Sequence, residues 1–175
     1  MEIIAILSLR LPNYQKIFYK STMQPKLDPT DRQILAALQF DATQSLESIA
    51  ERLNVSLNTV WRRVRRLESD GVIEKRVALL DNDRLGLPLT AFVQIRTDNH
   101  SAQWAADLTA AVTAIPEIVE FYRLAGEVDY ILKMIVASVA DYDRVYQQLI
   151  SRVKISNVSA SFAMEKLKFT TELPL

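Results

Sequence analysis

The chain has 175 residues, of which 49% are hydrophobic and 24% charged, and its 21 basic side chains balance 21 acidic ones. This composition is typical of a globular protein and excludes an intrinsically disordered chain. The absence of cysteine excludes a disulfide scaffold, a cysteine-ligated metal and a cysteine nucleophile, and the single histidine, His100, leaves little for imidazole chemistry. The zero net charge neither supports nor excludes nucleic-acid binding, because a neutral total can conceal a polarised face.

The first 22 residues are predicted to be an extension outside the domain architecture. Their apolar run, 3–11, is about half of the roughly 20 residues that cross a bilayer. It also lacks the basic flank and the cleavage site of a secretory signal, so no membrane segment is expected. The regular pattern begins only after Met23, which favours a misassigned start; the alternative is a genuine helix that packs on a partner subunit.

Three helices are predicted in the segment 23–80. The first starts at Pro29, with Asp28 as N-cap and Asp31 at the positive end of the helix dipole, and runs to about Gln39. Serines cap the second and third helices, which only a three-residue turn separates. The third helix is expected to end near Gly71 and to bury a stripe of four residues: Leu57, Val60, Val64 and Leu67.

Residues 71–80 are rich in β-branched side chains and are predicted to form a short strand or wing. Turn-forming residues then fill 81–88, which is predicted to be a linker. This divides the chain into a winged helix-turn-helix domain, 23–80, and a second domain, 89–175.

The second domain reads strand, helix, strand, strand, helix, strand. The strands are expected at 89–97, 118–124, 130–136 and 158–168, and the helices at 101–114 and after the Ser138-x-x-Asp141 cap. This is the βαββαβ, ferredoxin-like order, so the predicted fold class is α+β. Such a sheet has one face without helices, and an apolar open face predicts pairing with another sheet.

The outer face of the third helix is cationic and able to hydrogen-bond. From Arg52 to Leu67 there are five arginines and no acidic residue. Because Arg, Asn and Thr can all contact base edges in the major groove, base contacts are predicted for Asn58, Thr59 and Arg62. Phosphate contacts are predicted for Ser56, Arg63, Arg65, Arg66 and Lys75. The alternative is a solvated charged helix face; the preceding helix, the capped turn and the wing favour DNA binding.

Three motifs follow one another along the chain. They are Leu27-Asp28 with Asp31-Arg32, then Ser56-x-x-Thr59-Val60-x-x-Arg63-Val64-x-x-Leu67-Glu68-x-x-Gly71, and Gly126-x-x-Asp129-Tyr130. They resemble the Lrp/AsnC (leucine-responsive, or feast/famine) transcription regulators. The resemblance implies an N-terminal winged helix-turn-helix and a C-terminal ferredoxin-like effector domain. It also implies homodimers that pair through their sheets, further assembly to tetramers or octamers, and a free amino acid bound between subunits.

The resemblance places this effector at the turn between the second and third strands of the second domain. Backbone groups and one carboxylate there are implied to hold the ligand: Leu124, Ala125, Gly126, Glu127 and Asp129. A neighbouring subunit is implied to add Ser161 and Phe162. The alternative is that Gly126 is a hairpin glycine and Asp129 only stabilises the turn. Residues 99–101 and the C-terminal tail are similar to a bacterial branch associated with sulfur-containing amino acids.

The predicted function is therefore a cytoplasmic, nucleoid-associated regulator that binds double-stranded DNA and responds to an amino acid. An enzyme is the first rival, since ferredoxin-like dimers include oxygenases and isomerases. The sequence has only three glycines and no clustered His or Cys, so it offers neither a phosphate-binding loop nor a metal site. The second rival is an effector-independent, nucleoid-type architectural DNA-binding protein, which needs no pocket.

Overall fold

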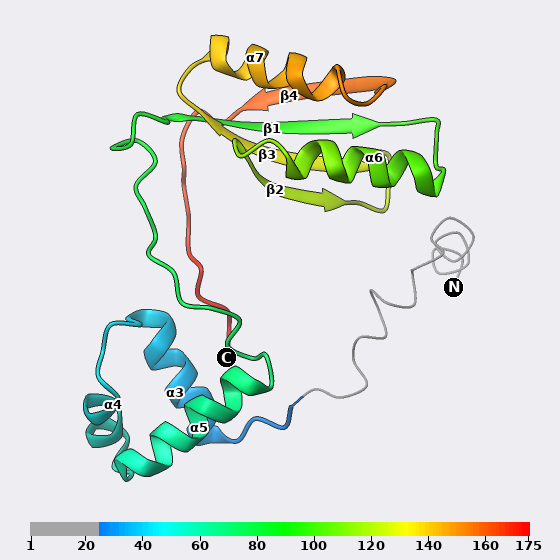
Figure 1. Ribbon diagram of the computed structural model, residues 1–175. Helices are drawn as coiled ribbons and strands as arrows, with labels where there is room; N and C mark the ends of the chain where they lie inside the picture. The colour runs from blue at the N-terminus through cyan, green and yellow to red at the C-terminus, as the bar shows by residue number, and fades with distance from the viewer. Residues whose placement is uncertain (1–24) are drawn as a thin grey trace. The chain divides into compact units, whose positions relative to one another are not determined.

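The computed structural model describes residues 25–175, which form two compact units (Figure 1). The first unit contains 25–78 together with 168–175, and the second is Leu79–Leu167. The predicted extension, 1–22, lies outside the described residues. No helix in the described part is both long and apolar enough to cross a membrane.

The first unit contains three helices: α3 (Pro29–Phe40), α4 (Leu46–Leu53) and α5 (Leu57–Ser69). The predicted N-caps are confirmed, since the side chains of Asp28, Ser45 and Ser56 each accept a hydrogen bond from the backbone N–H three residues later. The helices enclose one apolar core, formed chiefly by Ile34, Ala37, Ile49, Ala50, Val60 and Val64. Asn54 ends α4 with φ +52° and lets the chain turn sharply into α5.

Two expectations for this unit, the burial of Leu57 and a strand within 71–80, differ from the structure. Leu57 is 43% exposed, because it is the first residue of α5 and the core begins one turn later, at Val60. The segment 71–80 forms no strand: it begins with a turn at 71–73 and has no regular secondary structure from 74 to 80, and the described part of this unit contains no strand with which it can pair. Val77, Leu79 and Leu80 are exposed as a result.

The second unit has the predicted ferredoxin-like order. It contains β1 (Leu89–Arg96), α6 (Ala102–Thr113), β2 (Ile118–Arg123), β3 (Tyr130–Val136), α7 (Val139–Ile150) and β4 (Asn157–Phe162). The strands form one antiparallel sheet in the order β2-β3-β1-β4. The two helices pack on one face of this sheet, where they share a core with it (Figure 1).

The residues of β3 alternate between the two faces of the sheet. Leu132 and Met134 are fully buried under the helices, whereas Ile131 and Ile135 are half-buried on the open face. The neighbouring strands add Phe92 and Tyr122, both exposed, to that open face, where Glu120 of β2 also forms a 2.7 Å ion pair with Lys133 of β3. The open face thus combines the apolar side chains of Phe92, Tyr122, Ile131 and Ile135 with polar ones, which include Gln94, Lys133, Ser159 and Ser161.

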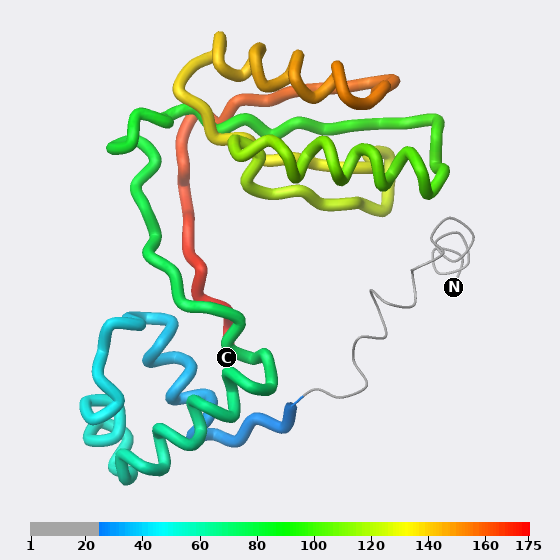
Figure 2. Tube along the Cα trace, in the orientation of Figure 1, coloured from blue at the N-terminus to red at the C-terminus, as the bar shows by residue number. Residues whose placement is uncertain are grey.

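The predicted last strand, 158–168, is too long. β4 ends at Phe162 because its only partner, β1, begins at Leu89, and the ladder closes with the Ala163 N–H donating to the Thr90 carbonyl. The chain then continues to its C-terminus in the first unit (Figure 2). There the Gln39 side chain accepts a hydrogen bond from the Leu173 N–H (2.7 Å) and donates one to the Leu173 carbonyl (3.2 Å). Residues 168–175 therefore belong to the first unit, although the sequence assigns them to the second domain.

Candidate DNA interface and effector turn

The exposed face of α5 carries the side chains predicted to read bases. Asn58 and Arg62 are exposed, and neither has a polar side-chain partner among residues 25–175. Thr59 is half-buried, and its hydroxyl shares a 2.8 Å hydrogen bond with that of Ser56. The amide and the guanidinium are therefore unoccupied, whereas the two hydroxyls complete the cap of the helix.

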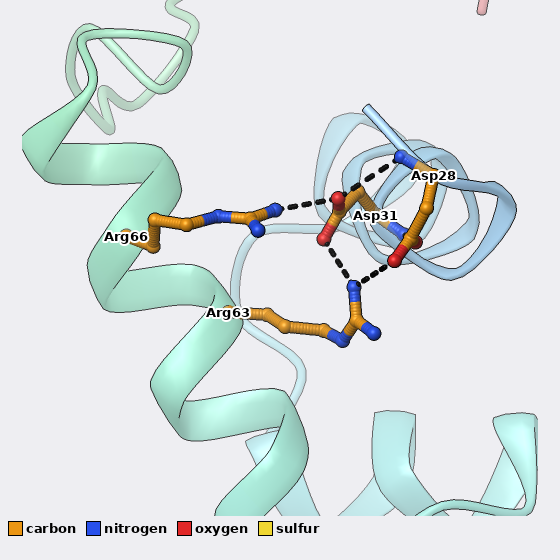
Figure 3. A network of polar contacts seen from close by, with 4 residues as sticks. All are labelled: Asp28, Asp31, Arg63 and Arg66. Carbon is orange, nitrogen blue, oxygen red and sulfur yellow. Dashed lines mark hydrogen bonds and ion pairs between the residues drawn. The ribbon is translucent and has the colours of Figure 1, made fainter. Parts of the chain in front are cut away.

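The predicted phosphate contacts fall into two groups. Arg65 and Lys75 are exposed; Arg65 lies over the half-exposed Trp61 ring, 5.6 Å from its centroid, and 3.8 Å from Glu68. Arg63 and Arg66 point instead toward the N-terminus of α3 (Figure 3). The outer face of α5 thus presents fewer unpaired arginines than the sequence suggests.

Four charged side chains connect α5 to α3 (Figure 3). Nη1 of Arg63 donates to Oδ2 of Asp28 at 2.6 Å and to Oδ1 of Asp31 at 2.8 Å. Nη2 of Arg66 donates to Oδ2 of Asp31 at 2.5 Å. The two carboxylates also form the capping box of α3, in which each accepts the other residue's backbone N–H. The same pair therefore caps one helix and binds the other.

These contacts favour the charged forms of Asp28, Asp31 and Arg63. Burial of Asp31 opposes its ionisation, but the hydrogen bonds from Arg63, the Asp28 N–H and Arg66 outweigh burial and lower its pKa. The pKa of Asp28 is lowered by the Asp31 N–H and then by Arg63. The hydrogen bonds to Asp28 and Asp31 raise the pKa of Arg63.

The predicted effector turn joins β2 to β3. Asp129 holds it in place: its carboxylate accepts the Thr97 N–H at 2.9 Å, its carbonyl accepts the Leu124 N–H, and its own N–H donates to Ile95. Gly126 has φ +148°, while a Cβ added there would meet open space, so conformation is what requires glycine. Gly126 and Asp129 thus have the structural roles of the alternative prediction, in which Gly126 is a hairpin glycine and Asp129 stabilises the turn. These roles do not prevent either residue from contacting a ligand.

The same turn exposes groups suited to a zwitterion. Among residues 25–175, none accepts a hydrogen bond from the backbone N–H of Ala125, Gly126 or Glu127. Glu127 is paired only loosely with Arg96, at 3.5 Å, and its side chain is 90% exposed. The second carboxylate oxygen of Asp129 lies 4.0 Å from Nδ1 of His100.

The two remaining predicted effector residues lie elsewhere in the sheet. Phe162 pairs with Ala91, whereas the turn adjoins Ile95, four residues or about 13 Å further along β1. They also lie on opposite faces: Ser161 is next to Phe92 on the open face, and Phe162 contacts the Tyr142 ring of α7 at 5.2 Å. One chain does not bring Ser161 and Phe162 to the turn.

Tyr130 has a position in the core. It is 7% exposed and contacts the rings of Phe121 at 5.5 Å and Trp104 at 5.8 Å.

The described residues contain no group of three or more His, Cys, Asp or Glu side chains arranged to hold a metal ion.

Sequence reasoning missed the α3–α5 network. Its signal is the spacing, because Asp28 and Asp31 are three residues apart and so are Arg63 and Arg66, which gives each helix a charged pair on one face. The contact between Gln39 and the C-terminal tail has no comparable signal in the sequence.

Comparisons with known proteins match both units. Residues 27–74 match a winged helix-turn-helix DNA-binding family, and residues 90–173 match the Lrp/AsnC ligand binding domain. A glutamate uptake regulatory protein of Zymomonas mobilis is 51% identical over 150 residues, which cover 86% of this chain and 92% of that protein.

Two crystal structures have the same fold. An AsnC family transcriptional regulator from Agrobacterium tumefaciens is 44% identical, with a TM-score of 0.82 over 85% of this chain and 97% of the other. A transcriptional regulator from Neisseria meningitidis, solved as a complex with L-Met, is 29% identical, with a TM-score of 0.80 over the same shares of the two chains.

Proposed function

Since the chain belongs to the Lrp/AsnC family of DNA-binding transcriptional regulators, which are not enzymes, we propose that it reads a specific DNA sequence and changes its assembly or DNA binding when an amino acid binds between subunits. The observation that carries DNA reading is the pair of exposed, unpartnered side chains on α5, Asn58 and Arg62. Both are near the start of the second helix of a helix-turn-helix, the end that contacts base edges. The proposed place of action is the bacterial nucleoid, in the cytoplasm.

Arg62→Ala is expected to relax sequence preference at one base position and to cost about 1–3 kcal/mol there, because a bidentate contact to guanine is lost. The measurement is selection of duplexes from a random pool by the wild-type and variant proteins, followed by titration of single-base variants of the selected site. Arg65→Ala is the matched control, an arginine on the same helix that is predicted to contact phosphate; it is expected to weaken all duplexes alike. Equal losses on every duplex for both variants would contradict base reading by Arg62.

The effector is proposed to be a free amino acid whose carboxylate binds the exposed N–H groups of the β2–β3 turn, with the ammonium near Asp129. The structure of the similar regulator from Neisseria meningitidis is a complex with L-Met, which supports this class of ligand. Ser161 and Phe162 are proposed to come from a neighbouring subunit, which fits their distance from the turn within one chain. The proposed oligomeric state is a homodimer that pairs through its open sheet faces and assembles further to tetramers or octamers.

Sedimentation of the protein with each of the twenty amino acids is expected to show at least one that shifts the assembly state or makes it more resistant to dilution. Asp129→Ala is expected to abolish that shift and to retain DNA binding. Asp107→Ala is the control, because that acidic residue lies on α6, away from the turn. An oligomer that responds to no amino acid would instead support an effector-independent architectural protein.

A further inference from the structure

We propose that the carboxylate pair of Asp28 and Asp31 sets the position of α5 on the first unit, and that Arg63 supports DNA binding through this pair as a positioning residue. This inference rests on the proposed reading of DNA by α5. It gives Arg63 a role other than the phosphate contact predicted from the sequence.

The guanidinium of Arg63 already binds two carboxylates within the protein. Its side chain is only 23% exposed, and one guanidinium nitrogen serves both carboxylates. Its Nε is buried without a hydrogen-bond partner among the described residues. Turning Arg63 toward a phosphate would leave the Asp31 carboxylate, 1% exposed, without its main counter-charge, which is unfavourable in a buried site.

The other contacts of α5 with α3 and α4 are apolar packing contacts, which fix the orientation of the helix less specifically than directional hydrogen bonds do. Val60 and Val64 meet α3 and α4 through an apolar core, and such contacts are not directional. The charged hydrogen bonds are directional, and they hold two successive turns of α5 at Arg63 and Arg66. Arg62 adjoins Arg63, so a rotation of α5 displaces the proposed base contacts directly.

Arg66 differs from Arg63 in its access to solvent. Its side chain is 47% exposed and uses one nitrogen for Asp31, so other donors stay open to solvent. A phosphate contact by Arg66 is compatible with its ion pair. The positioning role is therefore assigned to Arg63 and to the two carboxylates.

The test measures Kd for a duplex that the wild-type protein selects from a random pool and for a scrambled duplex of equal length, between 50 and 200 mM salt. Asp31→Asn is expected to weaken binding to the selected duplex at least tenfold, although it removes a negative charge, and not to weaken binding to the scrambled duplex. Arg63→Ala is expected to weaken binding to the selected duplex by a similar factor. The salt dependence of its binding to the scrambled duplex is expected to remain unchanged. Arg65→Ala, the control, is expected to reduce the magnitude of the slope of that dependence by about 0.9, the value for one lost phosphate contact.

Asp28→Ser keeps an N-cap for α3 and removes only one carboxylate from Arg63, so it remains informative if the stronger variants do not fold. This variant is expected to weaken binding to the selected duplex severalfold without changing the salt dependence of binding. Two results would overturn the positioning role. One is that Arg63→Ala reduces the magnitude of the salt slope by about 0.9 and lowers the affinity for both duplexes equally. The other is that Asp31→Asn binds both duplexes more tightly than the wild-type protein does. Failure of the wild-type protein to select any sequence would refute sequence-specific reading itself, and the positioning role with it.

Discussion

Leu132→Ala is expected to lower the free energy of unfolding of the second unit by about 2–5 kcal/mol. Leu132 is completely buried in the centre of the sheet, where β3 lies between β1 and β2 and faces the helices. Truncation removes apolar surface from the core and leaves a cavity that the antiparallel strands on both sides prevent from closing. Urea unfolding, followed by the emission of Trp104 in a Trp61→Phe background, measures the change in this unit.

Leu85→Ala is the matched control for that truncation. It makes the same chemical change in the same unit, but the Leu85 side chain is 58% exposed, so a change within about 0.5 kcal/mol is expected. Similar losses for both variants would mean that Leu132 does not lie in a packed core.

Ile131→Asp is expected to convert the proposed homodimer to monomers over a concentration range in which the wild-type protein remains assembled. Ile131 adjoins Leu132 in β3 but lies on the open face of the sheet, among Phe92, Tyr122 and Ile135. A carboxylate buried at a subunit interface loses its hydration, and that desolvation is costly. Sedimentation velocity across a dilution series measures the shift.

Thr109→Asp provides the comparison, because this exposed residue lies on α6 and therefore on the helical side of the sheet. It is expected to leave the assembly unchanged. If Ile131→Asp remains assembled at every concentration, the sheet face is not the subunit interface, and another surface must supply Ser161 and Phe162 to the effector turn.

The sequence was most informative where local chemistry decides the structure. The N-caps at Asp28, Ser45 and Ser56 depend on residues three positions apart, and all three were predicted. The strand at 130–136 was likewise predicted with the bounds that β3 has. These features need no knowledge of distant parts of the chain.

The missed features depend on partners that are distant in the chain. The strand predicted to reach residue 168 stops at Phe162, because β1 begins at Leu89 and extends only two residues beyond the Ala91–Phe162 pair. Arg63 was assigned to phosphate because its partner, Asp31, is 32 residues away and only the crossing of two helices brings them together. Periodicity assigns a residue to a helix face, but it does not show which other element that face meets.

The path of the tail limits how the protein can be divided. A cut at the linker predicted from the sequence separates Gln39 from Leu173, because the last eight residues follow the second unit in the chain but belong to the unit that contains α3. A chimera that exchanges the helix-turn-helix with that of a relative must therefore exchange residues 168–175 as well. A purification tag attached after Leu175 would likewise be attached to the DNA-binding unit.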